Sequence, residues 1–239
     1  MNYLVGDIGN TLTKLSILND NFKSKKIYNI ETKKILQGNL KKNILNKIIN
    51  KKFSRNILFS SVVPKAFKII KNYLKNHKYK VFEIKDLDIK KILKIKVKNY
   101  NQLGSDRISN ALGSLKYRNC LIIDFGTATT FDIIKKGVYD GGVISPGVDL
   151  SIMNLSNSTA LLPLFKLKKF QKNYGKNTRE ALNAGFLWGY EGLINNIIHR
   201  ISKNSKIKFK IILTGGYAKL FKRYLNKKST IDENITING

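Results

Sequence analysis

Two short segments of this chain contain residue types that could bind a phosphate. Residues 7–11 read Asp-Ile-Gly-Asn-Thr and residues 124–130 read Asp-Phe-Gly-Thr-Ala-Thr-Thr, and each follows an apolar run. Glycine lets backbone N–H groups approach a phosphate because no Cβ intervenes, and threonine hydroxyls add hydrogen bonds. The carboxylates of Asp7 and Asp124 would repel a phosphate unless a cation such as Mg²⁺ lies between them. The alternative is that each aspartate only caps its own turn through an Asx hydrogen bond.

The repetition of this pattern decides between the alternatives. Residues 4–13 and 121–130 both consist of an apolar strand, an Asp-x-Gly turn and a small polar run that enters a second strand. Two copies, one in each half of the chain, indicate a duplicated domain. We therefore expect two phosphate-binding turns facing each other across a cleft that holds a nucleoside triphosphate.

A third segment, residues 103–107 (Leu-Gly-Ser-Asp-Arg), lies at the start of a predicted helix. Backbone N–H groups at a helix N-terminus favour an anion. Asp106 could accept a proton from a substrate hydroxyl, and Arg107 could hold an anionic group of the substrate. The alternative is a capping carboxylate with a solvent-facing partner.

The elements that must position these residues alternate between strands and helices. Apolar runs predict strands at residues 3–6, 15–18, 56–63, 81–84, 120–124, 129–134 and 211–213. Helical periodicity predicts helices at residues 34–52, 65–76, 104–117, 178–203 and 217–226. This order indicates an α/β fold. We place a domain boundary near Arg118, which gives an N-terminal half at residues 1–118 and a C-terminal half at residues 119–239.

Composition excludes several classes of protein. The chain has 239 residues, of which 42% are hydrophobic, enough for a sizeable core and too many for wholesale disorder. No apolar run reaches about 18 residues, which argues against a membrane span, and the N-terminus does not resemble a signal peptide. We therefore expect a cytoplasmic protein. The single cysteine, Cys120, excludes an internal disulfide and a cysteine-based zinc site, and we expect it to be a small core residue.

The net charge of +30 raises the question of nucleic-acid binding. Only six of the 45 basic residues are arginine, the residue that suits bidentate base and phosphate contacts. The lysines are spread along the chain among Asn and Ile, residue types with AT-rich codons, so genome composition can explain the excess. A polyanion-binding surface is the alternative, and we expect nucleic acid not to be the main ligand.

Taken together, these segments resemble type III pantothenate kinase. The match includes residues 7–11, 103–107 and 124–130, followed by Gly-Gly-Val-Ile-Ser-Pro-Gly at residues 141–147. It continues through residues 159–163, 175–178 and 213–216, and so covers nearly the whole chain. The segment at residues 103–107 separates this family from other kinases of the same superfamily.

The resemblance implies an acetate kinase–sugar kinase–Hsp70–actin fold. This is a duplicated ribonuclease H-like (actin-like ATPase) fold with two halves around a nucleotide cleft, usually found as a homodimer. It also implies ATP-dependent phosphorylation of pantothenate to 4'-phosphopantothenate, the first step of coenzyme A biosynthesis, with Mg²⁺ and a monovalent cation, K⁺ or NH₄⁺, as cofactors.

Site residues follow from the same resemblance. Asp106 corresponds to the general base and Asp124 to the residue that binds the monovalent cation. The ATP-binding positions are Asp7, Ile8, Gly9, Asn10, Thr11, Leu12, Thr13, Lys14 and Thr127. The substrate-binding positions are Tyr100, Gly104, Ser105, Asp106, Arg107 and Thr178.

Two other functions are compatible with parts of the sequence. Another kinase or phosphatase of the same superfamily would share the two turns, but residues 103–107 argue against it. A nucleic-acid-binding or transcription-accessory protein would suit the charge, but no helix-turn-helix or aromatic–basic stacking motif is visible.

Overall fold

The computed structural model describes residues 1–38, 45, 48 and 53–239. The chain forms two compact units: unit 1 comprises Met1–Lys116 together with Asn234–Gly239, and unit 2 comprises Tyr117–Glu233. The boundary expected near Arg118 lies close to this division. The last six residues, which we had assigned to the C-terminal half, belong instead to unit 1.

Unit 1 contains a five-stranded sheet in the order β3-β2-β1-β4-β5. The first three strands are antiparallel, whereas β4 and β5 run parallel to β1. The strands are β1 (Tyr3–Ile8), β2 (Leu12–Leu18), β3 (Ser24–Glu31), β4 (Asn56–Ser61) and β5 (Lys80–Glu83). The helices are α1 (Thr32–Leu36), α3 (Pro64–Asn76), α4 (Ser105–Gly113) and α8 (Ile235–Asn238), with short 3₁₀ turns η1 (Ile84–Asp86), η2 (Ile89–Lys91) and η3 (Tyr100–Gln102).

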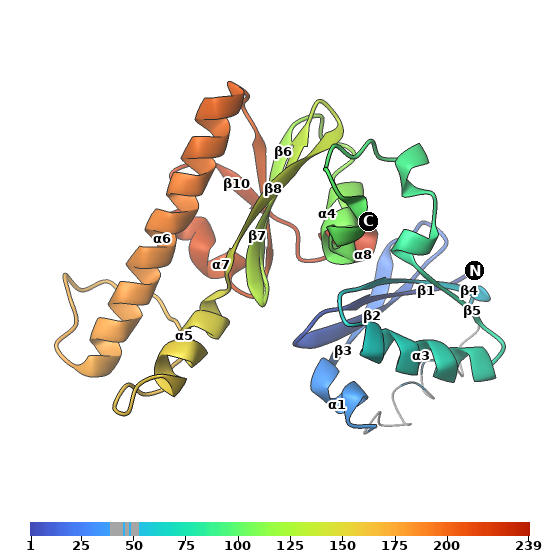
Figure 1. The fold of residues 1–239 in the computed structure, drawn as a ribbon, viewed down its shortest axis with the longest axis horizontal. Coiled ribbons are helices and arrows are strands. Elements are labelled where there is room, and N and C mark those ends of the chain that lie inside the picture. Colours follow the sequence, from blue (N-terminus) through green and yellow to red (C-terminus); the bar gives the residue numbers. More distant parts are fainter. Residues whose placement is uncertain (39–44, 46–47, 49–52) are drawn as a thin grey trace. The chain divides into compact units, whose positions relative to one another are not determined.

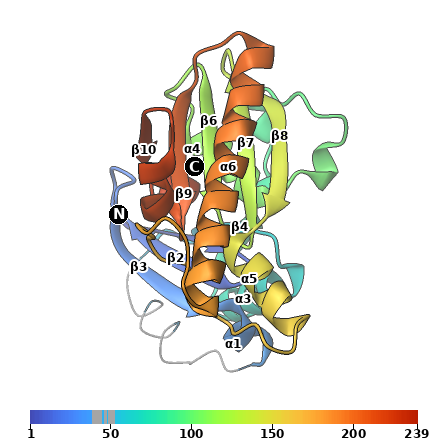
Figure 2. The same cartoon turned by 90° about the vertical axis from the view of Figure 1, so that its left-hand side faces the viewer.

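Unit 2 contains a second five-stranded sheet, in the order β10-β9-β6-β7-β8. Its strands are β6 (Cys120–Phe125), β7 (Ala128–Lys135), β8 (Val138–Pro146), β9 (Lys210–Gly215) and β10 (Ser229–Ile231). Its helices are α5 (Val148–Asn157), α6 (Thr178–Ser205), α7 (Ala218–Phe221) and the 3₁₀ turn η4 (Lys222–Tyr224). Figure 2 shows the long helix α6 lying along this sheet.

The two sheets have the same topology. In each, the first strand of the unit lies at the centre, with an antiparallel strand pair on one side and two parallel strands on the other. The central strands β1 and β6 each end at one of the two Asp-x-Gly turns. The duplication predicted from these turns is therefore confirmed.

Apolar periodicity explains the main elements. Strand β6 is a continuous apolar run because both of its faces are covered: Leu121, Ile122 and Ile123 are fully buried, and so is Cys120, as expected of a core residue. Helix α3 buries Ala66, Ile70 and Leu74 at four-residue spacing and begins at a proline, which needs no hydrogen-bonded N–H there.

Several predicted elements differ from those in the structure (Figure 1). The helix expected at residues 34–52 lies mostly outside the described residues, and only α1 is described near its start. The helix expected at residues 217–226 is divided into α7 and η4, and the one expected at 104–117 ends at Gly113. Sequence analysis did not predict β3, β8, β10, α5 or α8.

The C-terminal segment belongs to unit 1 because its apolar residues pack against α4. Ile235 and Ile237 are buried, and a Cβ at Gly113 would overlap the carbonyl oxygen of Ile235. A hydrogen bond of 2.7 Å joins Thr236 Oγ1 to Asn110 Oδ1. The short helix α8 therefore packs against α4 and is part of unit 1.

No helix in the described part of the chain is long and apolar enough to cross a bilayer.

Candidate nucleotide and substrate site

The first Asp-x-Gly turn connects β1 to β2 and is held by buried hydroxyls. Gly9 N donates to the carbonyl oxygen of Leu12 at 3.0 Å. The Oγ1 of Thr32, at the start of α1, donates to the carbonyl oxygen of Gly9 at 2.6 Å and lies 3.0 Å from Thr13 Oγ1. Thr32 N also donates to the carbonyl oxygen of Thr11 at 3.0 Å. Thr32 thus holds the turn through these hydrogen bonds. Sequence analysis did not identify Thr32, because no local pattern links residue 32 to residue 9.

Within residues 7–14, only part of the segment is available to a ligand. Asn10 and Thr11 are exposed at the tip of the turn, whereas Ile8 is a core side chain that offers only its backbone. Thr13 is also buried, and its hydroxyl contacts Thr32 rather than solvent. A phosphate approaching this turn would therefore meet backbone N–H groups and the side chains at its tip.

The second turn, between β6 and β7, is one residue shorter than the first, and its glycine likewise donates a backbone hydrogen bond to a residue that follows it. Gly126 N donates to the carbonyl oxygen of Ala128 at 3.1 Å, and Gly126 and Thr127 are exposed. This turn is held by close contacts with two other glycines. A Cβ at Gly147 would overlap the carbonyl oxygen of Thr127 and lie 2.6 Å from that of Gly126. The segment at residues 141–147 thus ends in a glycine because only glycine fits against the turn.

A second glycine, Gly215, packs against the end of β6. It has φ +84°, and a Cβ there would lie 2.5 Å from the carbonyl oxygen of Phe125 and 2.6 Å from Asp124 Oδ1. Gly216 N donates to the same carbonyl oxygen of Phe125 at 3.0 Å. The carboxylate of Asp124 is therefore enclosed by backbone on this side.

The neighbours of the two turn aspartates differ in charge. Asp7 lies opposite Lys14 on β2 and opposite Ser60 on β4. Asp124 lies opposite Thr130 on β7 and Thr214 on β9, both of them buried. Directly opposed residues point to the same face of a sheet, so the strand neighbour of Asp7 on β2 is a lysine, whereas the strand neighbours of Asp124 are threonines.

The third segment places a carboxylate at the start of α4. Gly104 is the N-cap, and a Cβ there would overlap Asp106 Oδ1, so glycine leaves room for this carboxylate. Arg107 N donates to Asp106 Oδ1 at 2.8 Å. Burial raises the pKa of Asp106, although the Arg107 hydrogen bond and the positive charges of Arg107 and Lys85 oppose that change. A carboxylate with a raised pKa is better suited to accept a proton near neutral pH.

Other predicted substrate residues lie near this carboxylate in the chain. Ser105 is buried, so its side chain does not face solvent. Tyr100 is half-buried on η3, where Lys90 Nζ lies 5.1 Å from the ring centroid. Burial, together with the charges of Glu83 and Asp88, raises the pKa of Tyr100. Its hydroxyl therefore stays protonated and can donate a hydrogen bond.

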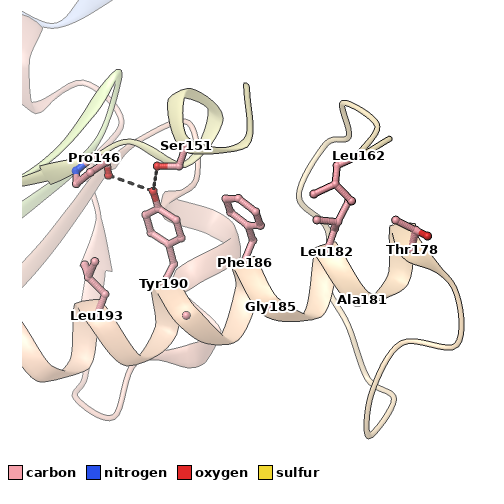
Figure 3. A pocket seen from close by; sticks show the side chains of 11 residues that line it. Pro146, Ser151, Leu162, Thr178, Ala181, Leu182, Gly185, Phe186, Tyr190 and Leu193 are labelled. Carbon is pink, nitrogen blue, oxygen red and sulfur yellow. Dashed lines mark hydrogen bonds between the residues drawn. The ribbon is translucent and has the colours of Figure 1, made fainter. Parts of the chain in front are cut away.

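Thr178 lies in unit 2, where it is the first residue of α6. Asn177 caps this helix by accepting a hydrogen bond from Glu180 N at 3.0 Å. Thr178 is exposed and lines an apolar groove of about 640 Å³ along α6 (Figure 3). At the far end of this groove, Tyr190 Oη lies 2.7 Å from Ser151 Oγ and donates to the carbonyl oxygen of Pro146 at 3.3 Å.

Relatives with known family membership match this arrangement over most of the chain. The family model of type III pantothenate kinase matches residues 3–200. A type III pantothenate kinase from Pelagibacter ubique is 46% identical over 239 residues, which cover 99% of this chain and 96% of the relative. This chain belongs to the type III pantothenate kinase family. Another member, from a Sulfurihydrogenibium species, is 36% identical over 254 residues, covering 99% of this chain and 96% of that relative.

Solved structures confirm the fold of this type III pantothenate kinase family member. A putative Baf family transcriptional activator from Campylobacter jejuni is 20% identical with a TM-score of 0.61, covering 98% of this chain and 93% of the other. An activator of 2-hydroxyisocaproyl-CoA dehydratase from Clostridium difficile, solved with bound ADPNP, is 12% identical with a TM-score of 0.60, covering 100% and 91%. The predicted actin-like ATPase fold is therefore correct.

The oxygen atoms that this chain offers as metal ligands suit hard cations. No group of three or more His, Cys, Asp or Glu side chains that could hold a metal ion occurs among the described residues. Mg²⁺ in kinases needs only one or two carboxylates, since phosphates and waters complete its shell. The carboxylate of Asp124, with hydroxyls opposite it and a backbone carbonyl beside it, offers the oxygen ligands that a monovalent cation takes. The residues present therefore fit both ions.

Proposed function

We propose that Asp106 is the general base of the reaction that this chain catalyses. The reaction is the ATP-dependent phosphorylation of pantothenate in coenzyme A biosynthesis. The primary hydroxyl oxygen of pantothenate forms a bond to the γ-phosphorus of ATP, the bond from that phosphorus to the β–γ bridging oxygen breaks, and ADP leaves. The hydroxyl proton passes to Asp106. The position of this carboxylate in the first turn of α4, where Gly104 leaves room for it and Arg107 N donates to it, is the observation that carries the assignment.

The nucleotide phosphates are assigned to the glycine turns. In unit 1, the segment from Asp7 to Lys14 contributes backbone N–H groups and the exposed tip, and in unit 2 Thr127 contributes an exposed hydroxyl and N–H. Mg²⁺, when bound with ATP, offsets negative charge on the phosphates. Asp7 would hold it, either directly or through water.

A monovalent cation is assigned to Asp124. This carboxylate lies beside a phosphate turn, and its opposed neighbours Thr130 and Thr214 carry no charge. K⁺ or NH₄⁺, when bound, would offset the negative charge there. Lys14 lies opposite Asp7 on the neighbouring strand, whereas the residues opposite Asp124 on β7 and β9 are threonines.

Pantothenate is assigned to the α4 segment and to Thr178. Arg107 pairs with the substrate carboxylate, Gly104 and Ser105 present their backbone, and Tyr100 donates its hydroxyl. A homodimer is part of the same proposal, because the groove that begins at Thr178 exposes apolar side chains that a second copy would cover. We also propose a cytoplasmic location and no direct role for nucleic acid or a membrane.

The test is an ADP-release assay with and without pantothenate, in K⁺ and in Na⁺ buffers. We expect pantothenate-dependent ADP release that is faster in K⁺. ADP release that does not depend on pantothenate contradicts the function, and equal rates in the two buffers contradict only the cation site. Light scattering on the purified chain measures the oligomeric state.

A further inference from the structure

A tyrosine–carboxylate pair in unit 2 lies outside every segment that carried the family resemblance. The hydroxyl of Tyr217 donates a hydrogen bond to Asp149 Oδ1. Tyr217 precedes α7, directly after the Gly215–Gly216 turn, and Asp149 lies in the first turn of α5. The bond therefore joins two segments that are far apart in the sequence.

Each of these two segments packs against the second phosphate turn. On the α5 side, Gly147 contacts the carbonyl oxygens of Gly126 and Thr127. On the α7 side, Gly216 N donates to the carbonyl oxygen of Phe125 at 3.0 Å. The Tyr217–Asp149 bond thus joins the two segments that support this turn.

The ring of Tyr217 is held on the core side. Its centroid lies 6.3 Å from that of Phe221, and the Phe221 ring stacks on Phe125 at 5.3 Å with an interplanar angle of 13°. Phe125 is the residue just before the glycine of the turn. A chain of packed rings therefore connects the turn to Tyr217, and this packing leaves the hydroxyl directed at Asp149.

The charge state of the pair keeps the hydrogen bond in place. Burial raises the pKa of Tyr217, and the hydrogen bond and negative charge of Asp149 raise it further, so the hydroxyl remains a donor throughout the physiological range. Asp149 is exposed and lies in the first turn of a ten-residue helix, where the helix dipole stabilises a carboxylate.

We propose that the Tyr217–Asp149 pair is a clasp that sets the affinity of this chain for ATP. By joining the two supports, the clasp holds the Phe125–Ala128 backbone in the geometry that receives phosphate, so less ordering is needed when nucleotide binds. Tyr217 and Asp149 are positioning residues in this role. The proposal rests on the assignment of this turn to the nucleotide.

The test compares Tyr217→Phe, Asp149→Ala, the double variant and a matched control, Tyr224→Phe, in the same unit. Calorimetry measures the Kd of a non-hydrolysable ATP analogue with Mg²⁺, and steady-state kinetics measures kcat and both KM values. We expect each single change to raise the Kd and the KM for ATP by about five- to tenfold, the scale of one hydrogen bond. We expect kcat, the KM for pantothenate and all values for Tyr224→Phe to stay within about twofold.

The double variant identifies the clasp, since the two side chains act through one bond. The Kd of the double variant should equal the Kd of the single variant that binds the analogue more weakly. The proposal is overturned if both single variants bind the analogue with a Kd within twofold of the parent's, or if the two effects multiply in the double variant. It is also overturned if Tyr224→Phe loses as much affinity, or if the parent binds no analogue. Failure of the kinase function is a separate result, because the parent would then bind the analogue without consuming ATP on addition of pantothenate.

Discussion

The two Asp-x-Gly turns follow equivalent strands but have different supports. In both, the glycine N–H donates to a carbonyl two or three residues later, at 3.0 Å in unit 1 and 3.1 Å in unit 2. Unit 1 holds its turn with the hydroxyl of Thr32, whereas unit 2 holds its turn with two glycines in close contact. Side-chain hydroxyls thus hold the first turn, whereas close glycine contacts together with the Gly216 N–H bond to Phe125 hold the second.

The turn aspartates differ in the same way. Lys14 lies opposite Asp7 and belongs to the chain, whereas Asp124 has only the hydroxyls of Thr130 and Thr214 opposite it. The duplicated positions thus differ in the charge of the residues paired with them.

The largest expected effect comes from Asp106, in the first turn of α4 in unit 1. Asp106→Asn keeps the shape but removes the proton acceptor, and kcat should fall by about 10²- to 10⁴-fold while analogue binding is kept. Activity of the parent should fall as the pH decreases through the raised pKa of Asp106, because the base becomes protonated. Turnover by Asp106→Asn near the parent rate would show that another group takes the proton.

The same carboxylate makes a prediction for stability. Its pKa is higher in the folded chain than its ordinary value of 3.8, so the folded state binds more protons between the two values. The free energy of unfolding of the parent should therefore decrease relative to Asp106→Asn as the pH rises from about 4 through the folded pKa. Denaturant titrations of both proteins at several pH values measure this difference.

The second turn, which is held by close contacts with glycines, should be more sensitive to a glycine-to-alanine change than the first turn. Gly147→Ala forces a Cβ into the Thr127 carbonyl, and a displacement of about 1 Å at a catalytic turn can cost about 100-fold in kcat/KM for ATP. Gly9→Ala brings a Cβ only to 3.0 Å from the Leu12 carbonyl and should cost much less. Gly192→Ala, on the open surface of α6, is the control. Equal losses at residues 147 and 9 would argue against the steric support.

The two aspartates should respond differently to the cation in the buffer. Asp124→Asn should remove most of the activation by K⁺ and lower kcat by about tenfold, since the carboxylate that holds the ion is gone. Asp7→Asn should keep the K⁺ activation and weaken the Mg²⁺–nucleotide complex instead. Rates measured across a K⁺ titration at constant ionic strength distinguish the two, and identical K⁺ responses would contradict the assignment.

The Thr32 hydroxyl that holds the first turn can be removed while the shape of the side chain is kept. Thr32→Val leaves the Gly9 carbonyl and the buried Thr13 hydroxyl without this partner, and should destabilise the fold by about 1–3 kcal/mol and raise the KM for ATP several-fold. Adding Thr13→Val should recover part of the stability, because an unpaired buried hydroxyl is then removed. Thermal unfolding measures both steps; a double variant less stable than Thr32→Val would contradict the pairing.

The smallest effect is expected at the lysine-rich surface. Lys65, Lys68 and Lys75 lie exposed on α3. Their replacement by Gln should leave kcat/KM within about twofold, since exposed charges interact weakly at physiological salt. A loss above tenfold would show that this surface takes part in the reaction, and steady-state assays at two salt concentrations separate a screening effect from a specific one.

Local patterns made much of the fold predictable. The buried run of β6 and the four-residue spacing of α3 identified their elements, and the repeated turns gave the duplication. The edge strand β3 was missed because its lysines and mixed exposure give no clear alternation. The helix predicted at 217–226 is divided because residues 218–221 and 222–224 pack with different helical geometry.

The sequence suggested candidate site residues where those residues are adjacent in the chain. The segments around Asp7, Asp106 and Asp124 each carry a local signal, a carboxylate beside glycine and hydroxyls. Two other residues act through contacts with residues far along the chain: Thr32 at the first turn and Tyr217 near the second. Only the tertiary structure brings such partners together, and the pairing of strand registers likewise revealed that Lys14 lies opposite Asp7.

The return of the C-terminal segment to unit 1 makes unit 2 an insertion within another folding unit. Ile235 and Ile237 leave the ribosome after every residue of unit 2, so the surface of α4 over Ser109–Gly113 lacks its cover while unit 2 is being synthesised. Each buried isoleucine is worth about 1.5–3 kcal/mol, a large share of a domain's stability. Unit 2, whose strands are continuous in the chain, can therefore complete its folding before unit 1 does.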